Sequence, residues 1–120
     1  MPTEYDVAIC GAGPGGSTLA YILASRGLRT ALIEKQSNFS NEFRGEGVMP
    51  SGYTALKSIG FDLEEIDIPM QTNSKVKVHY HGQNLISGDL PFNDDGGLRW
   101  VSQPSLLEHI ITEASNYEKF

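Results

Sequence analysis

The sequence predicts an α/β fold that begins with a strand, a helix and a second strand in a βαβ arrangement. Three observations carry this prediction: an apolar run rich in Val and Ile over residues 5–10, helical periodicity from Pro14 to Arg26, and a second apolar run over 28–34. Two strands that a helix of this length separates are expected to pair in parallel through a right-handed crossover. A smaller antiparallel sheet and a last helix are expected to follow.

Each part of the βαβ unit has its own local signals. The run YDVAIC, with polar residues before it and glycines after it, indicates a buried strand. Pro14 suits the first helical position and Gly27 suits the helix stop. The apolar positions of this helix recur with helical spacing: Leu19, Ala20, Ile22 and Leu23.

The middle of the chain changes character. Residues 35–47 are polar, contain several glycines and show little periodicity, which predicts a long loop. Pro50 is expected to open a short helix that runs through Ile59, with Gly60 after its end.

Strict alternation over residues 75–81 predicts a half-exposed strand. Its two faces would be Val76, Val78 and Tyr80 on one side and Lys75, Lys77, His79 and His81 on the other. A turn at 82–84 leads to a partner strand at 85–87, and 98–102 offers a third antiparallel strand. The last helix, over 104–117, carries an apolar stripe of Leu106, Leu107, Ile110, Ile111 and Ala114.

Composition and charge exclude several classes of protein. Nine Lys and Arg against 15 Asp and Glu give a formal charge of −6, so nucleic acid is not an expected partner. No apolar stretch is long enough for a transmembrane segment, and the first residues lack the pattern of a secretory signal. The single cysteine excludes an internal disulfide, which fits a cytoplasmic location.

The junction between the first strand and the helix reads Gly11-Ala12-Gly13-Pro14-Gly15-Gly16 and matches the pattern GxGxxG. In this pattern the first glycine permits a tight turn, the second lets the backbone approach a pyrophosphate, and the third lets helix and strand pack closely. Unpaired N–H groups at the helix start then face the phosphates. The strand before the motif and the helix after it favour a Rossmann-like dinucleotide site.

A carboxylate stands where this site would need one. Glu34 ends the second strand, 23 residues after Gly11, and could accept hydrogen bonds from a ribose diol. A 2′-phosphate would be repelled there, so the turn predicts FAD or NAD and not NADP.

The other potentially reactive side chains are not expected to have catalytic or metal-binding roles. Cys10, at the end of a strand expected to be buried, is interpreted as a small packing residue. His79 and His81 lie two apart with no third ligand in view, so no metal site is predicted. Solvated surface is the default for Glu64, Glu65, Asp94 and Asp95, and no catalytic acid or base can be named.

Beyond the glycine turn, the sequence resembles the FAD-dependent monooxygenase family typified by p-hydroxybenzoate hydroxylase. The resemblance lies in residues 5–35, in RGEGVMP at 44–50, in the helix that ends at Ile59-Gly60-Phe61, and in WVSQPSLL at 100–107. It implies FAD as the cofactor, with Arg44 contacting the flavin nucleotide and Gln103 reaching the cofactor. Arg44 could instead pair with Glu42 and Glu46, and Gln103 could cap the last helix. Lys35, beside Glu34, completes the candidate cofactor-binding set: Gly11, Gly13, Pro14, Gly15, Gly16, Glu34, Lys35, Arg44 and Gln103.

The resemblance further implies an NAD(P)H-dependent monooxygenase acting on a small aromatic or polyketide-like substrate. The alternatives are a flavin-dependent reductase of the geranylgeranyl reductase type, a flavin halogenase, or an inert subunit that needs a complementary chain or self-associates. The expected organisation is a dinucleotide-binding and flavin-loop segment at 1–61, a small antiparallel sheet that begins the substrate domain at 62–102, and a helix returning to the main sheet at 103–120. Family members continue well beyond such a segment, so the FAD-binding domain is expected to be incomplete.

Overall fold

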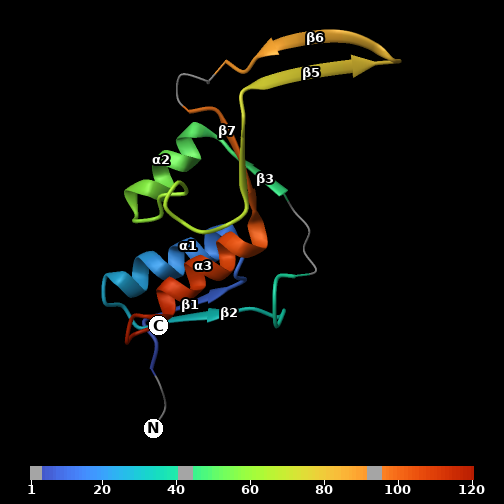
Figure 1. Ribbon diagram of the computed structural model, residues 1–120. Helices are drawn as coiled ribbons and strands as arrows, with labels where there is room; N and C mark the ends of the chain where they lie inside the picture. The colour runs from blue at the N-terminus through green and yellow to red at the C-terminus, as the bar shows by residue number, and fades with distance from the viewer. Residues whose placement is uncertain (1–3, 41–44, 92–95) are drawn as a thin grey trace. The chain divides into compact units, whose positions relative to one another are not determined.

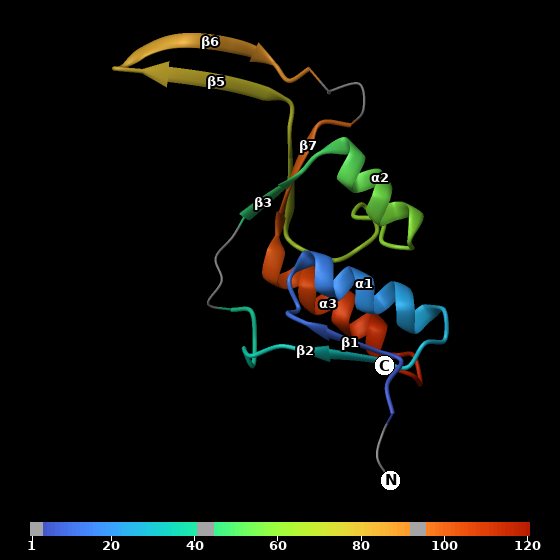
Figure 2. The same ribbon diagram turned by 180° about the vertical axis from the view of Figure 1, so that it is seen from behind.

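The computed structural model describes residues 4–40, 45–91 and 96–120, and it has the mixed α/β composition that the sequence predicts (Figures 1 and 2). These residues form two compact units. The first contains the described residues among 1–44 together with Gln103–Phe120, and the second is Gly45–Ser102. Residues 45–61 belong to the second unit, whereas the sequence-based division placed them with the dinucleotide-binding segment.

The first unit is the expected βαβ arrangement. Strand β1 (Val7–Cys10) pairs in parallel with β2 (Thr30–Ile33), and helix α1 (Pro14–Ser25) connects them. The register joins Val7 to Thr30 and Cys10 to Ile33. Helix α3 (Gln103–Ser115) packs against α1, and its buried residues include all but one of the predicted stripe: Leu106, Leu107, Ile110 and Ala114.

The prediction that the first strand is buried is wrong for one of its faces. Exposure alternates along β1, and both Ala8 and Cys10 are exposed. Within this unit, helix residues pack on the other face, where Leu32 belongs to a cluster with Leu107 of α3. Cys10 is therefore an exposed free thiol and not a packing residue.

The buried face of α1 consists of small side chains. Ser17, Ala20 and Ala24 are buried, whereas Leu19, which we assigned to the apolar stripe, is 45% exposed. The buried Ser17 Oγ donates a hydrogen bond of 2.8 Å to the Ala12 carbonyl oxygen. Of the other predicted positions, Ala20 is buried, whereas Ile22 and Leu23 are half-buried. Because helix and strand approach closely, the fully buried positions of α1 are small residues.

The second unit contains an antiparallel sheet in the order β3-β7-β4, with β3 at Gly45–Val48, β7 at Leu98–Ser102 and β4 at Met70–Asn73. Helix α2 (Pro50–Ser58) follows β3 as predicted. The sequence analysis assigned β3 to a loop and did not find β4. Their sequences, GEGV and MQTN, lack the alternating apolar pattern of a strand and pair only because β7 lies between them.

A buried arginine connects α2 to this sheet. Arg99 of β7 is 7% exposed, and its guanidinium carbon lies 3.8 Å from the centre of the Tyr53 ring. Its Nε donates a hydrogen bond of 2.8 Å to Glu64 Oε1. Glu64, which we interpreted as solvated, keeps half of its side chain exposed but also pairs with this buried cation. The other predicted acidic pair, Asp94 and Asp95, lies outside the described residues.

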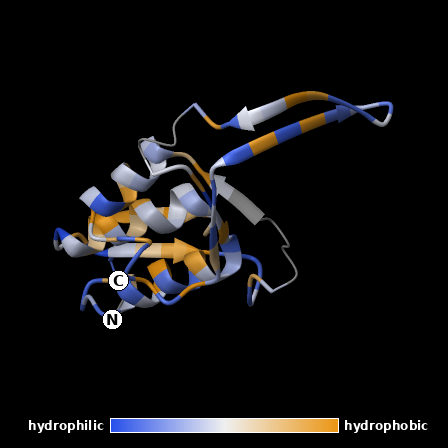
Figure 3. Cartoon of the chain, turned by 45° about the horizontal axis from the view of Figure 1, so that its top comes forward, coloured by the Kyte–Doolittle hydropathy of each residue, from blue (hydrophilic) through white to orange (hydrophobic). Residues whose placement is uncertain are grey.

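The hairpin of β5 (Lys75–Tyr80) and β6 (Gln83–Asp89) forms as a separate two-stranded sheet, and β7 is not its third strand. Its turn is His81-Gly82, with φ of 48° and 78°, as a type I′ turn requires, and not the predicted 82–84. Apolar and polar residues alternate along β5 (Figure 3), but the apolar face is also open, with Tyr80 64% exposed. The register shift after Val78 leaves Leu85 without a partner residue.

We expect the stability of the chain to fall as the pH drops from about 4 to about 2. Hydrogen bonds from Lys57 and from the Tyr53 hydroxyl lower the pKa of Asp62 from 3.8 to about 2. A folded-state pKa below the unfolded value adds stability above the unfolded pKa, and this stability is lost as the carboxylate becomes protonated. Asp6, bonded to Arg29, also has its pKa lowered to about 2 and acts in the same direction.

Thermal melts of the wild type and of Asp62→Asn between pH 6 and pH 2 test the contribution of Asp62. The variant should melt at a lower temperature at pH 6, and the difference should vanish near pH 2. A difference that stays constant over this range would remove Asp62 from the explanation.

Candidate dinucleotide-binding site

The glycine turn lies between the end of β1 and the start of α1. Gly11 has φ of +96°, a left-handed conformation that other residues rarely adopt. Its N–H donates a hydrogen bond of 2.7 Å to the Ile33 carbonyl, which fastens the turn to the end of β2. The chain can therefore reverse immediately after β1 and enter the helix.

Gly16 and Gly13 differ sharply in their surroundings. A Cβ added to Gly16 would lie 1.9 Å from the Gly11 carbonyl oxygen, a distance that no real contact allows. A Cβ added to Gly13 would meet nothing within 4 Å. Gly16 is thus needed for packing within the protein, whereas the space beside Gly13 is open to a ligand.

The helix start offers donors to an anion. Pro14 is the first residue of α1, and the N-cap Gly13 has no side chain with which to cap the helix. The first turn contains no acidic residue. The N–H groups of this turn lack intrahelical acceptors, and the helix dipole adds partial positive charge, so the turn suits a phosphate group.

Glu34 directly follows β2, and backbone groups hold its carboxylate. Oε2 accepts a hydrogen bond of 2.7 Å from the Ala12 N–H, and Oε1 accepts one of 3.0 Å from the Gln36 N–H. These hydrogen bonds, Ala12 first and Gln36 second, lower the pKa of Glu34 below its ordinary value. The carboxylate is therefore ionised at neutral pH and linked to the glycine turn.

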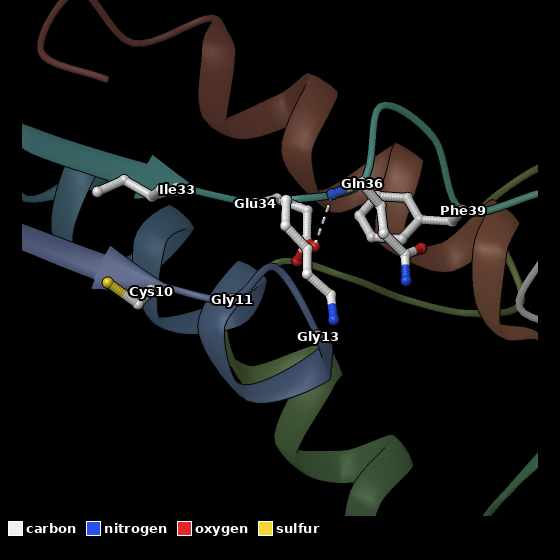
Figure 4. Close-up of a pocket in the computed structure, with 8 residues that line it drawn as sticks. Cys10, Gly11, Gly13, Ile33, Glu34, Gln36 and Phe39 are labelled. Atoms are coloured by element: carbon white, nitrogen blue, oxygen red, sulfur yellow. Dashed lines mark hydrogen bonds between the residues drawn. The ribbon is translucent and has the colours of Figure 1, made fainter.

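These elements surround an open cavity of about 450 Å³. Figure 4 shows Cys10 and Gly11 at the end of β1, Ile33 and Glu34 at the end of β2, and Gln36 and Phe39 in the segment that follows. The complete lining is Cys10, Gly11, Gly13, Ile33, Glu34, Lys35, Gln36 and Phe39. Four of the predicted site residues, Gly11, Gly13, Glu34 and Lys35, thus meet at one cavity.

The remaining candidates lie elsewhere. Gly15 and Gly16 are in the first turn of α1, and Gln103 is the buried first residue of α3. Arg44 lies outside the described residues. His79 and His81 belong to the exposed hairpin, and no three metal-binding side chains gather within the part of the chain that the structure describes.

The sequence analysis missed four residues of the cavity: Cys10, Ile33, Gln36 and Phe39. For Phe39 a signal existed, because it is one of only two apolar residues, with Phe43, in the polar stretch 35–47. The structure shows that it is only 9% exposed. The others reach the cavity because parallel strands end together at one edge of the sheet.

A βαβ unit with a tight glycine turn, uncapped helix N–H groups and an acidic residue at the end of the second strand defines a dinucleotide-binding protein. The comparison with family models agrees with this class. The chain belongs to the family described as "FAD binding domain", whose model matches residues 4–116.

Known proteins show how varied the relatives are. The 6-methylpretetramide 4-monooxygenase of Streptomyces rimosus is 30% identical over 120 residues, which cover 96% of this chain and 28% of that enzyme. The digeranylgeranylglycerophospholipid reductase of Picrophilus torridus is 48% identical over 52 residues, or 42% of this chain and 13% of the reductase. The chain therefore spans less than a third of either relative.

The fold also matches solved structures. PqsL of Pseudomonas aeruginosa, in a structure with bound 2-aminobenzoylacetate, superposes with a TM-score of 0.82 at 21% identity, over 98% of this chain and 32% of PqsL. No helix among the described residues is long and apolar enough to cross a membrane.

The two glycines of the first helical turn, Gly15 and Gly16, should respond differently to substitution by alanine. Gly16→Ala should destabilise the chain by about 1–3 kcal/mol, the usual range for overpacking. Its Cβ would strike the Gly11 carbonyl, which belongs to the backbone and cannot move aside cheaply. Gly15→Ala is the matched control, because a Cβ there meets nothing within 4 Å. Chemical denaturation measures both, and equal stability of the two variants would contradict the close contact.

Proposed function

We propose that the chain binds FAD through its adenosine diphosphate end, in the cavity at the ends of β1 and β2. Backbone N–H groups at the start of α1 would bind the pyrophosphate, with Gly11, Gly13, Pro14, Gly15 and Gly16 forming the turn that approaches it. Glu34 would accept hydrogen bonds from the adenosine ribose. The observation that carries this proposal is the ionised, backbone-held Glu34 carboxylate in the same cavity as the unobstructed Gly13.

The charge of Glu34 also favours one kind of dinucleotide. A ribose with free hydroxyl groups can donate to the carboxylate, whereas a 2′-phosphate would meet like charge at short range. FAD has such a free diol. Lys35 lines the same cavity, and Arg44 and Gln103 are proposed to secure the rest of the nucleotide.

The protein that contains this chain is proposed to be an NAD(P)H-dependent monooxygenase acting on a small aromatic or polyketide-like substrate. The similarity to 6-methylpretetramide 4-monooxygenase along nearly the whole chain supports this reading. Bound flavin would supply the redox chemistry, namely the acceptance of hydride and the activation of oxygen. The residues described here bind and orient its nucleotide end.

We propose the organisation that the sequence predicts, with a dinucleotide-binding segment at 1–61, the start of a substrate domain at 62–102 and a returning helix at 103–120, although residues 45–61 pack within the second compact unit. The proposed location is the cytoplasm. A complementary chain, or a second copy of this chain, would be its partner if the 120 residues act as a separate subunit.

A flavin-dependent reductase is the second candidate, because the 52 residues shared with the digeranylgeranylglycerophospholipid reductase are 48% identical. The two functions differ in what happens to oxygen. Substrate-dependent oxygen consumption with NAD(P)H by the protein that contains this chain supports a monooxygenase. Reduction of an isoprenoid double bond without oxygen uptake supports the reductase.

Gly13→Val should nearly abolish FAD binding and leave the fold intact. The new side chain would occupy the space through which a pyrophosphate reaches the backbone, but its Cβ would meet no protein atom within 4 Å. Flavin absorbance that co-elutes with the protein on gel filtration measures binding, and far-UV circular dichroism measures the fold. Retention of FAD by a folded variant would show that the turn has only a structural role.

Glu34→Arg should raise the Kd for FAD by about 10- to 100-fold, since hydrogen bonds to a charged group are lost and a cation replaces them. The same change should improve the binding of NADP⁺, whose 2′-phosphate the arginine can pair with. Glu34→Gln, which keeps the size and one acceptor, should lie between the wild type and the arginine variant. If all three proteins bound both nucleotides equally, Glu34 would not contact the ribose.

A further inference from the structure

Phe39 is an aromatic anchor within an otherwise polar segment. It is 9% exposed, although polar residues surround it in the sequence from Lys35 to Ser40. Its ring forms one hydrophobic cluster with Ala12 of the glycine turn and Leu107 of α3. Leu32 and Ile111 pack against this cluster. One side chain thus joins the segment after β2 to both the turn and the last helix.

The contacts of Phe39 coincide with the groups that hold Glu34. One hydrogen bond to the Glu34 carboxylate comes from the backbone N–H of Ala12, against which Phe39 packs. The other comes from Gln36, three residues before Phe39 in the same segment. The Phe39 ring has no group that could hydrogen-bond to the carboxylate, but one donor belongs to a residue that the ring contacts and the other lies in the segment that the ring attaches to the core.

The Phe39 ring also forms part of the cavity wall. Phe39 lines the 450 Å³ cavity and also a neighbouring one of about 260 Å³, which Leu32 and Ile111 line with Glu34. A smaller side chain would enlarge both spaces and leave the segment from 35 to 40 without its apolar contact. Within that segment, Asn38 Oδ1 accepts a hydrogen bond of 3.1 Å from the Ser40 N–H, which shapes only the local turn.

We propose that Phe39 is a positioning residue of the dinucleotide site, which fixes the orientation of Glu34 by holding Ala12 and the 35–40 segment together. This inference rests on the proposed function, because it assigns Glu34 to the ribose. Phe39 is not part of the GxGxxG pattern. It would act on the cofactor site indirectly, through its core contacts with Ala12 and Leu107.

Phe39→Ala should raise the Kd for FAD about tenfold, measured by calorimetry well below the melting temperature so that only folded protein is compared. Phe39→Leu, which keeps an apolar side chain of similar reach, should restore most of the affinity. Ile110→Ala is the matched control: Ile110 is 1% exposed in α3 but does not belong to the Phe39 cluster. It should lower stability and leave the Kd unchanged.

A second measurement separates positioning from general destabilisation. NMR titration of the Glu34 carboxyl in the ligand-free chain should show its lowered pKa in the wild type and in Ile110→Ala. In Phe39→Ala the pKa of Glu34 should move back towards the ordinary value, because the Ala12 and Gln36 donors are no longer held. Lys35 also lowers this pKa and stays beside the carboxyl, so the pKa should return only part of the way. In the Glu34→Gln background, Phe39→Ala should cost much less affinity than it does in the wild type, which is the non-additivity expected of coupled residues.

The possible failures are distinguishable. If the wild type does not bind FAD, the proposed function fails, and the titration still tests whether Phe39 orients Glu34. If the wild type binds FAD but Phe39→Ala and Ile110→Ala behave alike in affinity and titration, Phe39 is only a core residue and the inference is overturned.

Discussion

The contact between the Gly11 carbonyl and the α-carbon of Gly16 is the constraint on which the nucleotide site depends. It brings the first turn of α1 directly against the end of β1, and no side chain could stand between them. The close approach places the uncapped helix N–H groups beside the strand ends. It also accounts for the small residues Ser17, Ala20 and Ala24 on the inner face of the helix. Once the turn is fixed, the Ala12 N–H can reach the Glu34 carboxylate, and the two strand ends act as one site.

The sequence was most informative where local chemistry determines the backbone. The turn from Gly11 to Gly16, the helix limits at Pro14 and Pro50, and the parallel pairing of β1 with β2 could all be predicted, because each depends on residues close together in the chain. Strands β3 and β4 could not. Their glycines and polar side chains carry no strand pattern, and their pairing depends on β7, which lies far along the sequence.

The site shows the same division. Glu34 and the glycines were recognisable because their types and spacing carry the chemistry, whereas the contribution of Phe39 arises from tertiary packing with Leu107, 68 residues later. Exposure was also difficult to predict. Val7 to Cys10 has a composition typical of a strand covered on both faces, but within its compact unit only one face meets helix residues. Arg99 shows the opposite case. It is a charged residue that is buried because its guanidinium stacks on the Tyr53 ring and hydrogen-bonds to Glu64.

The exposure of Cys10 has a practical consequence for studying this molecule. The chain has a single thiol, and that thiol is accessible in the wall of the cavity, beside Gly11 and across from Ile33 in the strand register. A maleimide or a small fluorophore would therefore attach at one known point without engineering of the sequence. Because that point adjoins the strand ends, the rate of labelling would report whether the cavity is filled, and an attached dye would sense a ligand entering it by a change in emission.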